Sequence, residues 1–82
     1  MARRGLSEAS KRAAAIQASR RMIARGERPG YRLRPVHDGS WQVDGLPGLS
    51  MPAMAARDAL DAVRDTIADL LGVGPDSFDV ER

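Results

Sequence analysis

The side chains of this chain best suited to chemistry are its charged ones, and they are divided by sign along the sequence. Residues 1–36 hold ten Lys or Arg against two Glu, whereas residues 37–82 hold three Arg against nine Asp or Glu. The first part can attract polyanions, and the second part can attract basic surfaces. The division predicts two faces or two partners.

The basic residues of the first part fall in a segment rich in alanine and free of proline and glycine, which favours a helix. Helices of this kind bind nucleic acid chiefly through charge. The candidate nucleic-acid-binding residues are Lys11, Arg12, Arg20, Arg21 and Arg25. Because no aromatic residue interleaves them, stacking on single-stranded bases is not expected here. A solvated peripheral helix or a dimerisation arm is the alternative interpretation.

The acidic second part offers candidates for contact with a protein partner, namely Asp61, Asp65, Asp69 and Asp76. Met51 and Met54 are further candidates, because flexible methionines are common at contact surfaces. The same methionines also suit a seam of the core, and the sequence leaves both interpretations open.

Catalytic and metal-binding arrangements are weakly supported. His37 would need an activated partner and a cleft to act as a general base, and a turn histidine is the simpler interpretation. A two-metal carboxylate set could be imagined from Asp38, Asp44, Asp65 and Asp69. However, Asp38 is expected to start a turn, and Asp44 to pair with Arg32. Cysteine is absent. We therefore expect no cofactor, no metal and no enzymatic activity.

Helix signals place the basic residues on a helix from about Glu8 to Arg25, with Ser7 as its cap and Gly26 as its terminator. Its apolar stripe is thin, and Arg12 and Arg20 are expected close to that stripe. Met1 to Leu6 is read as a frayed basic tail.

Two alternating segments, residues 31–36 and 40–44, predict a β-hairpin. A three-residue loop keeps the polar and apolar faces separate, with Leu33 opposite Val43 and Arg32 opposite Asp44. Gly39 then supplies the left-handed residue that such loops need.

A corner at residues 46–48 and a short strand at residues 49–51 are expected to follow the hairpin. Apolar residues at three- and four-residue steps then predict a helix over residues 55–71, and residues 77–81 form a last strand. The predicted class is α+β, a small antiparallel sheet of order βββαβ with an additional N-terminal basic helix.

The length of 82 residues and only three aromatic side chains indicate a modest core, which favours a homo-oligomer such as a dimer. No apolar run approaches a membrane span and no secretory signal is recognised, so the expected location is cytoplasmic.

The central segment resembles the HicB antitoxin family. The resemblance rests on Asp38-Gly39-Ser40-Trp41-Gln42-Val43, Leu46-Pro47-Gly48 and Asp58-Ala59-Leu60, in that order. It covers residues 31–82 as one βββαβ domain and leaves residues 1–30 as a basic helix and linker. It implies a small sheet with a helix packed on one face. It also implies a non-catalytic protein that assembles as a dimer or larger and blocks a small basic ribonuclease toxin by occlusion.

Two other functions stay open. One is a nucleic-acid-binding module or regulator that uses the basic helix, since the element order is similar to that of double-stranded RNA-binding domains. The other is a small phage- or plasmid-type inhibitor of a host nucleoprotein complex.

Overall fold

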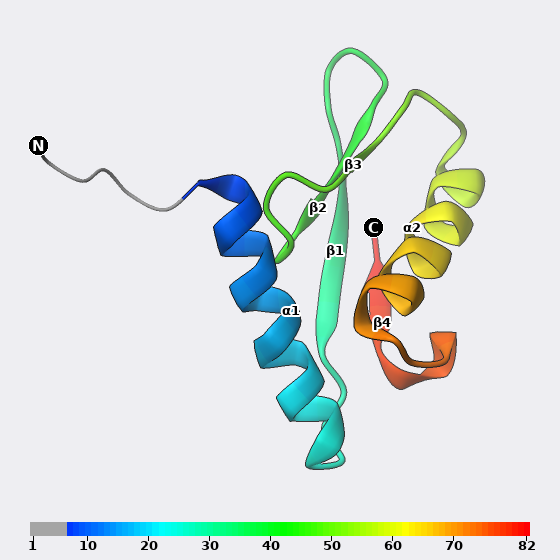
Figure 1. The fold of residues 1–82 in the computed structure, drawn as a ribbon. Helices are drawn as coiled ribbons and strands as arrows, with labels where there is room; N and C mark the ends of the chain where they lie inside the picture. The colour runs from blue at the N-terminus through cyan, green and yellow to red at the C-terminus, as the bar shows by residue number, and fades with distance from the viewer. Residues whose placement is uncertain (1–6) are drawn as a thin grey trace, which may run out of the picture.

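The computed structural model describes residues 7–82, and the tail expected at residues 1–6 lies outside this part. The elements are α1 (Glu8–Ala24), β1 (Gly30–Pro35), β2 (Trp41–Asp44), β3 (Ser50–Met51), α2 (Ala56–Leu71), the 3-10 turn η1 (Pro75–Ser77) and β4 (Asp79–Glu81). The predicted α+β class with an N-terminal helix is confirmed (Figure 1).

Helix α1 begins and ends close to the predicted residues. The Ser7 hydroxyl accepts a hydrogen bond from the backbone N–H of Ser10 at 3.1 Å, which satisfies one of the free donors of the first turn. At the other end, Gly26 has a φ of 83° and its N–H donates to the carbonyl of Ile23 at 2.9 Å. Glycine adopts this left-handed conformation without steric cost, and the helix therefore ends there.

The hairpin of β1 and β2 has the register expected from its faces. Leu33 lies opposite Val43, and Arg32 lies opposite Asp44. Gly39 has a φ of 90°, in agreement with a three-residue loop. The expected ion pair between Arg32 and Asp44 is wrong, because Asp44 instead accepts from Nε of Arg34 at 3.1 Å. Diagonal neighbours on one face of a sheet lie within reach of a long side chain, and the diagonal contact forms here.

The sheet is mixed, so the prediction of a purely antiparallel sheet is wrong for its last strand. The strand order is β3-β2-β1-β4, and β4 pairs with β1 in parallel. Two successive antiparallel pairings make β3 parallel to β1. Helix α2 then carries the chain back along the sheet, and a strand that follows such a crossover runs in the same direction as the strand before it.

The core lies between the two helices and one face of the sheet. Its buried residues are Tyr31, Leu33, Val43, Leu46, Ala59, Val63, Ile67, Leu71 and Phe78. The rings of Tyr31 and Phe78 meet edge to face with centroids 6.1 Å apart. Because side chains alternate along a strand, the opposite face of the sheet carries the exposed polar residues, among them Arg32, Arg34 and Gln42.

Helix α1 is docked on this core rather than free of it. Ile16 and Ile23 are half-buried against the core residues. The hydroxyl of Tyr31 donates to the hydroxyl of Ser19 at 2.5 Å, and both residues are buried. Ser19 is the buried residue of α1, and Arg20, which was expected close to the apolar stripe, is exposed. The helix thus packs on the same face of the sheet as α2.

Candidate binding surfaces

The outer face of α2 carries a row of carboxylates. Ala59, Val63, Ile67 and Leu71 recur every four residues and are buried. Asp61, Asp65 and Asp69 follow the same step, shifted by two residues, and all three are exposed. A shift of two residues corresponds to about 200° around an α-helix, so the carboxylates point away from the core. We call these three residues the acidic row.

The acidic row is only slightly neutralised by the protein itself. Asp61 lies 3.6 Å from Nη1 of Arg64, three residues along the helix. Within residues 7–82, Asp65 and Asp69 form no ion pair. The field of the row is therefore available to a basic partner. Sequence reasoning placed these three residues correctly because their spacing alone fixes their face.

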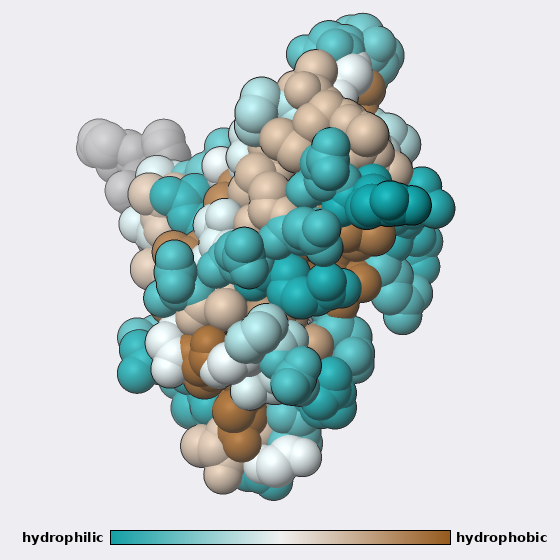
Figure 2. Space-filling model, turned by 90° about the vertical axis from the view of Figure 1, so that its right-hand side faces the viewer, coloured by the Kyte–Doolittle hydropathy of each residue, from teal (hydrophilic) through white to brown (hydrophobic). Residues whose placement is uncertain are grey.

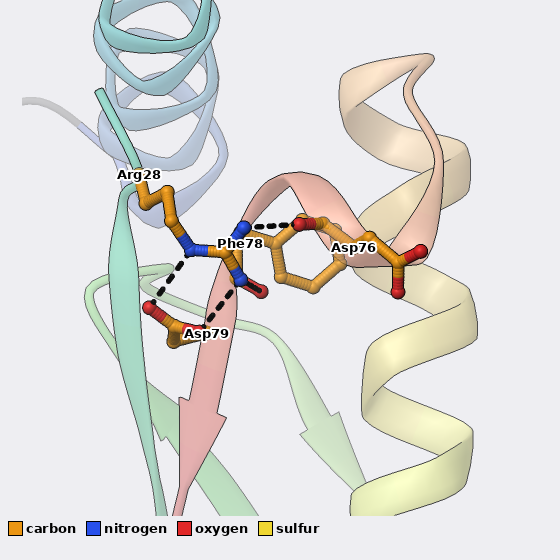
Figure 3. A network of polar contacts seen from close by, with 4 residues as sticks. All are labelled: Arg28, Asp76, Phe78 and Asp79. Atoms are coloured by element: carbon orange, nitrogen blue, oxygen red, sulfur yellow. Dashed lines mark hydrogen bonds and ion pairs between the residues drawn. The ribbon is translucent and has the colours of Figure 1, made fainter. Parts of the chain in front are cut away.

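Asp76 belongs to a different setting. It lies in η1, and its backbone carbonyl accepts from Nη1 of Arg28. Figure 3 shows its carboxylate pointing away from Arg28. Arg28 and Arg64 line the same open hollow as Asp76, of about 430 Å³. Two arginines thus border Asp76, which does not extend the acidic row as an unbroken negative surface.

Arg28 holds the linker before β1 to the start of β4. Its Nη2 lies 2.8 Å from Oδ1 of Asp79, its Nε donates to the other carboxylate oxygen, and Nη2 also donates to the carbonyl of Phe78 (Figure 3). The hydrogen bond from Arg28 lowers the pKa of Asp79 below its ordinary value. We did not predict this cluster. Its partners lie about 50 positions apart, and no local pattern in residues 27–30 signals the contact.

The methionine candidates lie on the border between core and surface. Met51 and Met54 are half-buried and pack against the core. Nε1 of Trp41 donates to the backbone carbonyl of Met54 at 3.0 Å, which fixes the segment before α2. Figure 2 shows moderately hydrophobic residues gathered in the upper part of the face that carries α2, above a band of hydrophilic ones. Both methionines therefore contribute to the core and keep part of their surface exposed, and their contact with a partner stays a prediction.

The five basic candidates of α1 are divided by the fold. Arg12 is half-buried and its Nη1 donates to the carbonyl of Pro47 at 2.9 Å, so this side chain attaches α1 to the corner after β2. Arg25 pairs with Glu27 at 3.1 Å. The same contact lowers the pKa of Glu27. Lys11, Arg20 and Arg21 are exposed and form no ion pair within residues 7–82.

The residues considered for catalysis do not come together. Asp38 accepts hydrogen bonds from the N–H and hydroxyl of Ser40 at 2.9 and 2.6 Å, which lower its pKa and close the hairpin loop. In residues 7–82, no group of three or more His, Asp or Glu is placed to hold a metal ion.

In the part of the chain that the structure describes, no helix combines the length and the apolar character that crossing a membrane requires.

Comparisons with protein families, with curated proteins and with solved structures found no match to this chain.

Proposed function

We propose that this chain is a HicB-like antitoxin, a non-catalytic protein that neutralises a small basic ribonuclease by covering its cationic surface. The observation that carries the proposal is the acidic row of α2, which is rigidly held and largely without internal counter-ions. The resemblance of residues 38–60 to the HicB family implies a basic ribonuclease as partner, whose charge is opposite to that of the row.

The physical basis is electrostatic complementarity. A ribonuclease must bind a polyanionic substrate, so its active surface is basic. Carboxylates aligned along one rigid helix can occupy that surface without ordering a flexible segment. Such contacts chiefly speed association and fix orientation, and their effect falls with ionic strength. Met51 and Met54 lie at the N-terminal end of the same helix and add apolar contact area.

The test uses the small basic ribonuclease that the proposal expects to be encoded beside this chain. The variant Asp61→Asn, Asp65→Asn, Asp69→Asn removes the row and keeps the size of each side chain. A control, Glu8→Gln, Asp44→Asn, Glu81→Gln, removes three exposed carboxylates elsewhere. If each exposed contact contributes about 0.5–1 kcal/mol, the row variant should bind roughly tenfold to 100-fold more weakly.

The measurement is inhibition of RNA cleavage by purified protein, at two salt concentrations. We expect the control to inhibit like the unmodified chain, and the row variant to lose both potency and salt dependence. Equal inhibition by both variants would refute the role of the acidic row. Absence of any complex with a neighbouring basic ribonuclease would refute the antitoxin function.

A further inference from the structure

Three exposed basic side chains of α1 form no ion pair within residues 7–82. Arg12 and Arg25 make contacts within the protein, which leaves Lys11, Arg20 and Arg21. Glu8, in the first turn, is the one acidic residue of α1, and no other acidic residue lies before Glu27. The remaining exposed positions of the helix are small or neutral, namely Ala9, Ser10, Ala13, Ala14, Gln17, Ala18 and Ala24. Another surface can therefore approach the helix closely.

The three cations are distributed around the helix in a definite way. Ser19 marks the centre of the buried side. At about 100° per residue, Lys11 and Arg20 lie about 80° and 100° from Ser19, on opposite flanks. Arg21 lies about 200° from Ser19 and points away from the core. Lys11 and Arg21 are also separated by about 15 Å along the axis.

We propose that α1 binds double-stranded DNA along the major groove, with Lys11 and Arg20 contacting phosphates of opposite strands and Arg21 facing the groove. The major groove of B-DNA is about 12 Å wide and admits one α-helix. A length of about 15 Å of duplex carries roughly nine phosphates, so both flanks of the helix meet negative charge. The site shares no residue with the acidic row, which lies on α2.

Other anionic partners fit this surface less well. An anionic membrane would need a free apolar face on α1, and Ile16 and Ile23 are committed to the core. An acidic protein would need an apolar centre around the charges, where α1 has only alanine methyl groups. Single strands are bound by aromatic stacking, which α1 does not offer. The major groove of A-form RNA is too deep and narrow for a helix.

The experiment measures binding of the full chain to a labelled 20-base-pair DNA duplex by fluorescence anisotropy, between 50 and 200 mM salt. Two or three phosphate contacts give a slope of log K against log salt of about −1.8 to −2.7, which is a loss of about 12-fold to 40-fold over this range. An RNA duplex, a single strand and polyglutamate serve as comparison ligands. All three should bind more weakly than duplex DNA.

The decisive variant is Lys11→Ala, Arg20→Ala, Arg21→Ala. Its matched control is Arg32→Ala, Arg57→Ala, Arg82→Ala, which changes exposed arginines elsewhere. Each removes three positive charges and takes the net charge from +2 to −1. We expect the α1 variant to lose the salt-dependent binding and the control to keep most of it. Circular dichroism verifies that both variants fold, and alanine is the best helix former for these sites.

Three results would overturn the proposal. The first is no binding of duplex DNA at 50 mM salt with protein at about 10⁻⁴ M, the weak limit of ordinary non-specific binding. The second is equal loss in the α1 variant and its control, which would assign the binding to net charge. The third is tighter binding of RNA duplex, single strand or polyglutamate than of duplex DNA. None of these results depends on the ribonuclease.

Discussion

The contact between Tyr31 and Ser19 is a buried hydrogen bond that joins α1 to β1, and a pair of substitutions can test how much it stabilises the docked helix. The two hydroxyls are 2.5 Å apart and both residues are almost inaccessible, with exposures of 6% and 7%. Tyr31→Phe removes the donor and leaves the ring against Phe78. Ser19→Ala removes the acceptor and strands a buried phenol hydroxyl. The double variant removes both groups together.

The expected magnitudes follow from the cost of leaving a buried polar group without a partner, about 1–3 kcal/mol. Ser19→Ala should destabilise by about 1–2 kcal/mol, since better helix propensity offsets part of the cost. Tyr31→Phe should be milder, because the serine hydroxyl can still donate to the carbonyl four residues earlier. The double variant should be less destabilised than the sum of the two, with a coupling of about 1 kcal/mol.

The assay is urea unfolding followed by circular dichroism, with thermal unfolding as a second measure. For a domain of this size, 1 kcal/mol corresponds to a change in Tm of about 4–8 °C. If the loss of stability in the double variant equals the sum of the losses in the two single variants, the two hydroxyls do not interact, which would contradict the hydrogen bond. So would two single variants that unfold like the unmodified chain. In either case the hydroxyl contact would contribute nothing to holding α1 on the domain.

Two further predictions concern the contacts that hold the corners of the fold. Gly48→Ala places a methyl group on the guanidinium of Arg12 at a φ of 81°, whereas Gly72→Ala meets open space at a φ of 69°. Both substitutions should lower the free energy of unfolding by about 1–2 kcal/mol, because alanine is strained in the left-handed backbone conformation. In urea unfolding, Gly48→Ala should cost about 1 kcal/mol more, because the methyl group displaces Arg12 from the carbonyl of Pro47. This difference should disappear when Arg12 is also replaced by alanine. Arg28 lowers the pKa of Asp79 in the folded protein, so this pair stabilises the fold above the pKa of the unfolded chain and the contribution is lost as the pH falls through the folded value. Arg28→Ala should therefore flatten the rise of stability with pH across the acidic range, and an unchanged pH profile of urea unfolding would count against the pair.

The parts of the fold that were predictable are those fixed by local alternation. The hairpin register followed from keeping Leu33 and Val43 on one face, because a shift of one residue would exchange core and solvent sides. The position of the acidic row followed from a four-residue step in the same way. Both depend only on neighbours in sequence and on the period of the element.

The parts that were missed depend on contacts between distant segments. The connection through α2 fixes the direction of β4 but not its neighbour in the sheet, so the pairing of β4 with β1 rather than with β3 could not be predicted. In the sequence, nothing distinguishes Arg12 from the other basic residues of the helix. Its partner, the carbonyl of Pro47, lies 35 positions away and is brought to the guanidinium only by the fold. A serine within an apolar helix face does indicate a buried hydrogen bond, and Ser19 could have been assigned from that signal.

The position of the charges, rather than their sum, determines which ligands this protein can attract. A net charge of +2 predicts a weak affinity for polyanions, yet the cations and carboxylates lie on two neighbouring helices of one rigid layer. The Debye length is about 8 Å at physiological salt and about 30 Å at 0.01 M, so the influence of one helix on a ligand of the other weakens as salt rises. At low salt the acidic row repels DNA from α1, so removing the row should strengthen DNA binding most at the lowest salt concentration.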